Sequence, residues 1–268
     1  MIDVVLKRAI EEYFSNFKVM LSFGVLFLFL PLFAFFQQFF FNSGTVFLSV
    51  NTTLFAIIGL IVALVFLYVF SFFVSLTVYS VHRDVQNISF DTYWSVLFKD
   101  AALKIFFLYL IFSLVFYLVT ILGFNSGLTS LALFINFVIA LAVMFAPQSI
   151  VLNSSSIGES VLKSIEFWIE TPVTSFAIFV IASILLCLIF LLEFVLDLVG
   201  MPGVIVSFFL VMVFLVPFIE QTKSYAYLLR VDLLKSNEVT HARAPRAEKQ
   251  KLVYSTRLRE RPKTGSKL

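Results

Sequence analysis

Long apolar runs alternate with short polar segments along most of the chain. A bilayer core about 30 Å thick needs roughly 20 apolar residues in a helix. Six runs without a lysine or arginine meet or approach that length: residues 19–41, 54–79, 105–122, 128–146, 173–198 and 201–219. The segments after the first, third and fifth runs are short, which favours antiparallel hairpins. The pattern predicts an all-α integral membrane fold with six transmembrane helices arranged as three hairpins.

The composition excludes several classes of protein. Of the 268 residues, 61% are hydrophobic and 13% are charged, whereas soluble domains have about 45–50% apolar and about 25% charged residues. Such a chain has too little polar surface to be a soluble enzyme, and too much apolar surface to be disordered. Cys187 is the single cysteine, so neither an intrachain disulfide nor a cysteine-based metal site is expected.

The cationic residues predict the orientation in the membrane. All 19 lysines and arginines lie in residues 1–18, between runs two and three, between runs four and five, or after run six. Short cationic loops stay cytoplasmic, so we expect a multi-pass protein of the cell membrane with both termini inside. Of the three glycosylation sequons, which begin at Asn51, Asn87 and Asn153, only Asn51 is expected outside. A glycan, if attached, is therefore expected at Asn51 alone.

Each predicted hairpin is preceded by an amphipathic segment. Residues 2–18, 90–98 and 156–170 carry apolar side chains at helical spacing, with charged residues elsewhere. Such helices lie flat at the headgroup level, or they pack under the helical bundle as a cap. Pro31 and Pro217 fall inside runs one and six, where each proline should distort the helix. Residues 221–234 are expected to extend the last helix.

Two stretches resemble a known family of membrane proteins. The first is Tyr13-Phe14-Ser15-Asn16-Phe17-Lys18. The second is Phe145-Ala146-Pro147-Gln148-Ser149-Ile150-Val151, followed by Ile157-Gly158-Glu159-Ser160-Val161-Leu162-Lys163-Ser164. They resemble the six-span family related to the membrane domain of glycerophosphoryl diester phosphodiesterases of bacteria and archaea. The resemblance implies a span that ends in a proline motif, an amphipathic helix and the next span.

The same resemblance bears on catalysis. Family members with a phosphodiesterase carry it as a separate barrel domain, and such a barrel needs about 250 residues. We therefore expect no phosphodiesterase domain in this chain. No common motif for a catalytic residue, a nucleotide, a cofactor or a metal occurs in the sequence. The protein is expected to be non-enzymatic, with no cofactor.

Two acids in run five are the best candidates for a site. Glu193 and Asp197 are four residues apart, which places them on one helix face near the outer boundary. Paired carboxylates can bind a cation or share a proton, but both side chains can also simply reach the outer headgroups. Gln37 and Gln38, near the outer end of run one, can hydrogen-bond to these acids or be solvated at the interface.

The end of the chain differs in composition from the rest. We predict a transmembrane domain with interfacial helices over residues 1–236 and a disordered basic cytoplasmic tail over residues 237–268, which holds nine Lys or Arg and three acids. Basic juxtamembrane segments attract anionic lipid headgroups. A protein partner is the second expectation, and nucleic acid is disfavoured because no folded module or aromatic interleaving accompanies the charge. The tail residues expected to face lipid are Arg243, Arg246, Lys249, Lys251, Arg257, Arg259, Arg261 and Lys263.

Three functions are compatible with these patterns. The first is a non-enzymatic membrane protein that organises lipid or a partner protein. The second is a transporter or permease component for a small solute, with Glu193 and Asp197 at its outer mouth. The third is a membrane subunit of a secretion or nucleic-acid transfer machine, which the basic tail suggests. Substitution of the two acids or deletion of the tail would separate these alternatives.

Overall fold

The computed structural model describes residues 2–15, 17–35, 39–42, 45–48, 54–86 and 100–230. Met1–Tyr227 forms one compact unit, and Leu228–Leu268 forms a second. The predicted boundary at residue 236 and the basic tail lie outside the described residues. So does the amphipathic segment 90–98.

The described chain is mostly helical, as expected. Among these residues, five helices are long and apolar enough to cross a membrane: Ile57–His82, Ala102–Asn125, Thr129–Asn153, Pro172–Leu198 and Gly203–Arg230. Predicted runs two to six fall in these helices, which are those of a multi-pass membrane protein. The last helix remains helical to Arg230, so the predicted extension beyond residue 220 is confirmed as far as the structure describes it.

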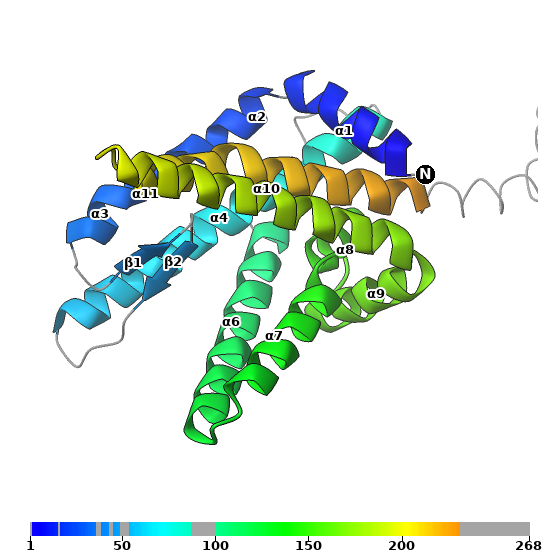
Figure 1. Cartoon of the computed structure of the whole chain (residues 1–268). Coiled ribbons are helices and arrows are strands. Elements are labelled where there is room, and N and C mark those ends of the chain that lie inside the picture. Colours follow the sequence, from blue (N-terminus) through cyan, green and yellow to red (C-terminus); the bar gives the residue numbers. More distant parts are fainter. Residues whose placement is uncertain are drawn as a thin grey trace, which may run out of the picture. The chain divides into compact units, whose positions relative to one another are not determined.

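The elements follow each other in a simple order (Figure 1). They are α1 (Ile2–Ser15), α2 (Phe17–Ser22), the 3₁₀ helix η1 (Phe23–Leu28), α3 (Phe29–Phe35), β1 (Phe39–Asn42), β2 (Thr45–Leu48), α4 (Leu54–Gln86), α6 (Ala102–Asn125), α7 (Thr129–Val143), α8 (Ala146–Asn153), α9 (Ile157–Glu170), α10 (Pro172–Leu198), α11 (Gly203–Leu210) and the π-helical turn η3 (Val211–Leu215). We call Gly203–Arg230, which contains α11 and η3, the last helix.

The prediction for run one is wrong at its end. Residues 19–41 were expected to form one helix, but Phe39–Asn42 is a strand that pairs antiparallel with Thr45–Leu48. The physical reason is that Phe and β-branched residues also favour strands. Apolar length alone does not separate a strand from the end of a helix.

Both prolines in the predicted spans accompany irregular helix. Pro31 follows η1, and Pro217 follows η3. A proline has no N–H, so the carbonyl four residues earlier loses its helical donor. For Pro217 that carbonyl belongs to Val213, and the hydroxyl of Tyr13 on α1 donates to it at 3.4 Å.

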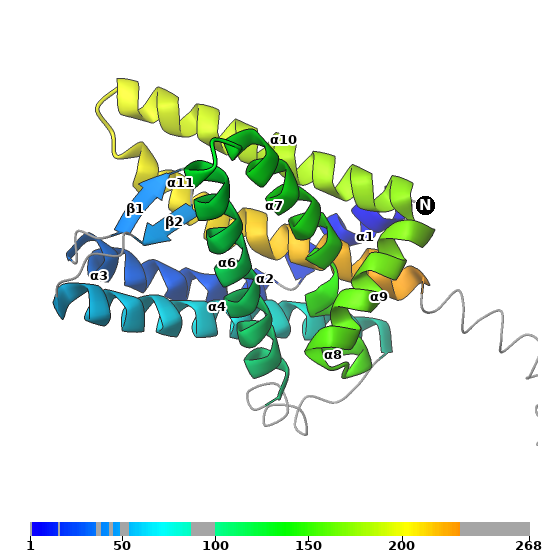
Figure 2. The same cartoon turned by 90° about the horizontal axis from the view of Figure 1, so that it is seen from below.

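Helices α6 and α7 form a tight hairpin, which Figures 1 and 2 show from two sides. Gly123 lies where the two helices are closest, and a Cβ atom added there would overlap the Cβ atom of Ala132. Gly127 adopts a positive φ of 72° in the turn, a conformation that glycine reaches without strain. The hairpin therefore depends on small residues at its closed end.

The predicted helix at 156–170 is confirmed as α9. Ser156 and Glu159 form a capping box, in which the Glu159 N–H donates to the Ser156 hydroxyl and the Ser156 N–H donates to the Glu159 carboxylate. These two bonds satisfy N–H groups that a helix start leaves open. The same bonds with Ser156 lower the pKa of Glu159, so its carboxylate stays charged at neutral pH.

The buried core joins several of these elements. Phe23 of η1, Tyr79 of α4, Ile105 of α6, Ile150 of α8 and Phe208 of α11 belong to one buried cluster. In contrast, α10 exposes most of its apolar side chains. This distribution is typical of helices with a lipid-facing side.

Candidate functional site

The structure gives different environments to the two acids that the sequence suggested as a pair. Glu193 is buried, with 6% of its surface exposed, whereas Asp197 is exposed. Oδ1 of Asp197 accepts a hydrogen bond of 2.9 Å from the backbone N–H of Gly203. A carboxylate is favourable at a helix N-terminus, so Asp197 stabilises the start of α11.

Gly203 makes this turn possible. A Cβ atom added at Gly203 would collide with the backbone carbonyl of Glu193 and with the Asp197 carboxylate. Gln37, Gln38 and Asn51 lie outside the described residues, so the predicted contacts of the glutamines with Glu193 and Asp197 stay a prediction.

A second cluster of polar side chains was missed by the sequence reasoning. It lies where the α7–α8 break meets α9 and the last helix, and we call it the polar elbow. The polar elbow consists of Gln148, Ser149, Asn153, Ser155, Lys163, Ser164, Glu220, Lys223 and Tyr227.

A buried ion pair forms the centre of the polar elbow. Lys223 Nζ lies 2.5 Å from Glu220 Oε1, and Gln148 Nε2 donates to Glu220 Oε2 at 2.8 Å. Glu220 and Lys223 are 7% and 6% exposed. Both carboxylate oxygens thus have a donor, as a buried charge requires.

The same cluster closes the break between α7 and α8. Lys223 Nζ donates to the Met144 carbonyl at 3.1 Å, and the Phe145 N–H donates to the Ser164 hydroxyl at 3.0 Å. Pro147 at the start of α8 supplies no N–H to the preceding turn. Polar groups of a broken helix need other partners, and here they come from α9 and the last helix.

Hydroxyl and amide groups extend the cluster along α8. Ser155 lies 3.2 Å from Ser149 and accepts a hydrogen bond of 2.8 Å from Lys163, while Asn153 donates to the Tyr227 hydroxyl at 2.7 Å. In the sequence, the polar stretch from Glu220 to Ser224 directly after an apolar run was the signal that could have revealed it. The partners of this last-helix segment lie 70 to 80 residues earlier in the chain. The spacing of residues within one helix could not predict them.

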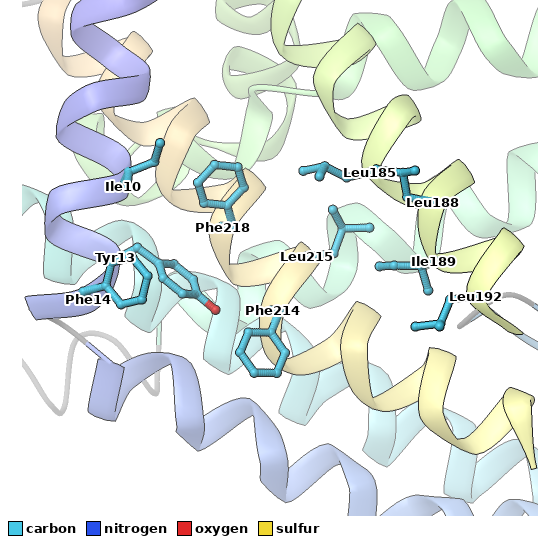
Figure 3. A pocket seen from close by; sticks show the side chains of 10 residues that line it. All are labelled: Ile10, Tyr13, Phe14, Leu185, Leu188, Ile189, Leu192, Phe214, Leu215 and Phe218. Atoms are coloured by element: carbon cyan, nitrogen blue, oxygen red, sulfur yellow. The ribbon is translucent and has the colours of Figure 1, made fainter. Parts of the chain in front are cut away.

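An apolar groove is the second candidate site. It has a volume of about 500 Å³ and lies between α1, α10 and the last helix. Figure 3 shows its ten lining side chains, with aromatic rings on the α1 and last-helix walls and aliphatic side chains on α10. The lining residues are Ile10, Tyr13, Phe14, Leu185, Leu188, Ile189, Leu192, Phe214, Leu215 and Phe218.

Tyr13 supplies the one side-chain polar group of this lining. Burial raises the pKa of Tyr13 to about 12, so the hydroxyl keeps its proton and acts as the donor to Val213. Because this donor is already used, the groove wall is chemically apolar. It can hold hydrocarbon, but it offers no group for acid–base chemistry.

No group of three His, Cys, Asp or Glu side chains that could hold a metal ion occurs in the part of the chain that the structure describes. Comparison with protein-family models, curated proteins and solved structures finds no match for this chain. The family resemblance of the Tyr13, Pro147 and Lys163 stretches stays a prediction.

Proposed function

We propose that this chain is a non-enzymatic membrane protein of the cell membrane that organises lipid around its helices. In this proposal it crosses the bilayer six times as three hairpins, with both termini in the cytoplasm. The stretch from Phe17 to Phe35 contributes the first crossing.

The use of the charged side chains supports this proposal. Glu220 and Lys223 bind each other and close the α7–α8 break, and Asp197 holds the start of α11. A transport pathway is normally lined by ionisable groups that face a cavity. Here Glu220, Lys223 and Asp197 make hydrogen bonds that hold the helices together, while the groove that opens on the surface is apolar. This contrast favours lipid over a polar solute as the partner.

Burial of Glu193 is the observation that favours the alternative, a transporter component. The two functions differ in what they require of the acids. Transport needs an acid that changes its charge or its ligand, whereas the organising role needs only folded helices. The proposal and its alternative therefore predict opposite results in a flux assay.

The flux assay uses the full chain in liposomes that contain a pH-sensitive dye, with a potential imposed by potassium and valinomycin. We expect the proton flux of proteoliposomes to equal that of protein-free liposomes. The variant Glu193→Gln with Asp197→Asn should behave identically. Protein-dependent flux that this variant abolishes would overturn the organising role and establish the transporter.

Orientation is tested with single cysteines in a Cys187→Ser background. We expect Lys163→Cys and Leu268→Cys to react with a membrane-impermeant maleimide only after the cytoplasmic face is opened. Asn51→Cys should react in intact cells, because six crossings with cytoplasmic termini put the chain after the first crossing outside. Labelling of Lys163→Cys and Leu268→Cys from opposite faces would contradict six crossings.

A further inference from the structure

We propose that the groove between α1, α10 and the last helix binds one acyl chain of a membrane phospholipid, with the lipid phosphate at Lys7. This inference rests on the proposed lipid-organising function and names the ligand and its site. It follows from the chemistry of the groove, its place among the helices and the position of one exposed cation.

Water is a poor occupant of this groove. A buried water molecule needs about two to four polar partners, and the lining is aliphatic and aromatic except for Tyr13. The Tyr13 hydroxyl is already bonded to the Val213 carbonyl, to which Pro217 has no N–H to donate. Hydrocarbon is therefore the occupant that the lining can accept without loss of hydrogen bonds.

The groove also has the size and setting of a lipid site. Its volume of about 500 Å³ falls in the range of about 300–1,000 Å³ typical of ligand pockets. Two of its walls, α10 and the last helix, are helices long and apolar enough to cross a membrane. The third wall is α1, which lines the groove with Ile10, Tyr13 and Phe14 and carries exposed charged residues within one or two turns of them.

Lys7 provides a partner for a phosphate. Lys7 is three residues before Ile10 and seven before Phe14, so all three share the face of α1 that borders the groove. The Lys7 side chain is exposed. Arg8, also exposed, is rotated about 100° from Lys7 around the helix and leaves that face.

Two acids of α1 affect which lipid headgroup can bind near Lys7. Asp3 and Glu11 lie one turn to either side of Lys7 and are exposed, so this face carries two acids and one lysine and does not favour a net anionic headgroup. A phosphate is shared by anionic and zwitterionic phospholipids, and a single ammonium suffices to bind it. The phosphate and the acyl chain are therefore the two parts of the lipid that the site recognises.

The test uses the full chain in nanodiscs with two photoreactive lipids that carry a diazirine near the end of one acyl chain. One probe is a phosphatidylcholine, and the other is a diacylglycerol without phosphate. We expect peptides of α1, α10 and the last helix that contain groove residues to be cross-linked. The phosphatidylcholine should be captured up to about fivefold more than the diacylglycerol, because an exposed ion pair contributes at most about that much.

Two groove-filling variants are paired with a surface control. Ile189→Trp and Leu188→Trp place a large ring in the groove and should reduce capture of both probes on the order of tenfold. Leu191→Trp makes the same change on the exposed side of α10, outside the lining, and should leave capture unchanged. Equal capture in Leu188→Trp, Ile189→Trp and Leu191→Trp would overturn the acyl-chain site, as would cross-links between two copies of the chain at these residues.

A pair of matched variants tests the phosphate contact separately. Lys7→Gln should remove the preference for the phosphatidylcholine, while Arg8→Gln should keep it. An unchanged preference in Lys7→Gln would refute the phosphate contact. Flux in the liposome assay would refute the organising role but leave the cross-linking result intact, so the two failures are distinguishable.

Discussion

Replacing Lys223 with methionine is expected to cost about 3–5 kcal/mol of stability, the usual penalty for leaving one partner of a buried ion pair alone. The substitution keeps an unbranched apolar side chain, one atom shorter, but removes the ammonium that Glu220 and the Met144 carbonyl share. The buried carboxylate then keeps only the Gln148 amide as a donor among the bonds described above. The midpoint of thermal unfolding in nanodiscs should fall on the order of 10 °C.

Two further variants make the Lys223 result specific. Lys104→Met breaks the exposed pair of Lys104 with Asp100, which are 2.8 Å apart, and should cost only about 0–1 kcal/mol. The double variant Glu220→Gln with Lys223→Met removes both charges, so it should be more stable than Lys223→Met alone. A Lys223→Met protein as stable as Lys104→Met would show that the ion pair does not hold the α7–α8 break.

Replacing Gly123 with alanine is expected to destabilise the protein by about 1–3 kcal/mol, the range for overpacked sites. In an ordinary helix position the same change stabilises by about 1 kcal/mol. Here the new methyl group would overlap the Cβ atom of Ala132, which is fixed to the backbone of α7. The two helices of the hairpin would have to separate, and the thermal midpoint in nanodiscs should fall.

Gly158→Ala is the matched control for this hairpin. It is the same substitution within a helix, but nothing lies within 4 Å of the added Cβ atom, so stability should be unchanged or slightly higher. Adding Ala132→Gly to Gly123→Ala moves the methyl group from one helix to the other and should recover part of the loss. If Gly123→Ala and Gly158→Ala have the same effect, the close approach of α6 and α7 is not needed for stability.

The sequence predicted the helices better than it predicted their contacts. Runs 105–122 and 173–198 became α6 and α10 with ends displaced by no more than a few residues, because twenty apolar residues in a bilayer have few alternatives to a helix. Run 19–41 was less determined, because its Phe-rich end forms β1 with β2. At these residues the strand preference of the side chains determined the structure, although the apolar run is long enough for a helix.

The candidate sites were harder to predict than the helices, because they depend on contacts between distant segments. Glu193 and Asp197 were predicted as a paired site because they are acids in an apolar run, yet Asp197 accepts a hydrogen bond from the Gly203 N–H. Lys223 was predicted only as part of a helical extension over residues 221–234, and its buried pair with Glu220 was not foreseen. Spacing shows which residues share a helix face, but it does not show which distant helix covers that face.

By itself, the sequence determined that this is a helical membrane protein, because hydrophobic burial depends on composition and run length, which are local properties. It also located the prolines that distort two helices. Only the tertiary structure decided that Lys223 donates to the Met144 carbonyl at the α7–α8 break, and that Tyr13 donates to the Val213 carbonyl, to which Pro217 has no N–H to donate. It alone placed α1 against α10 and the last helix to leave the apolar groove. These pairings join residues tens to hundreds of positions apart, and they form only when the packed helices bring unsatisfied polar groups within bonding distance.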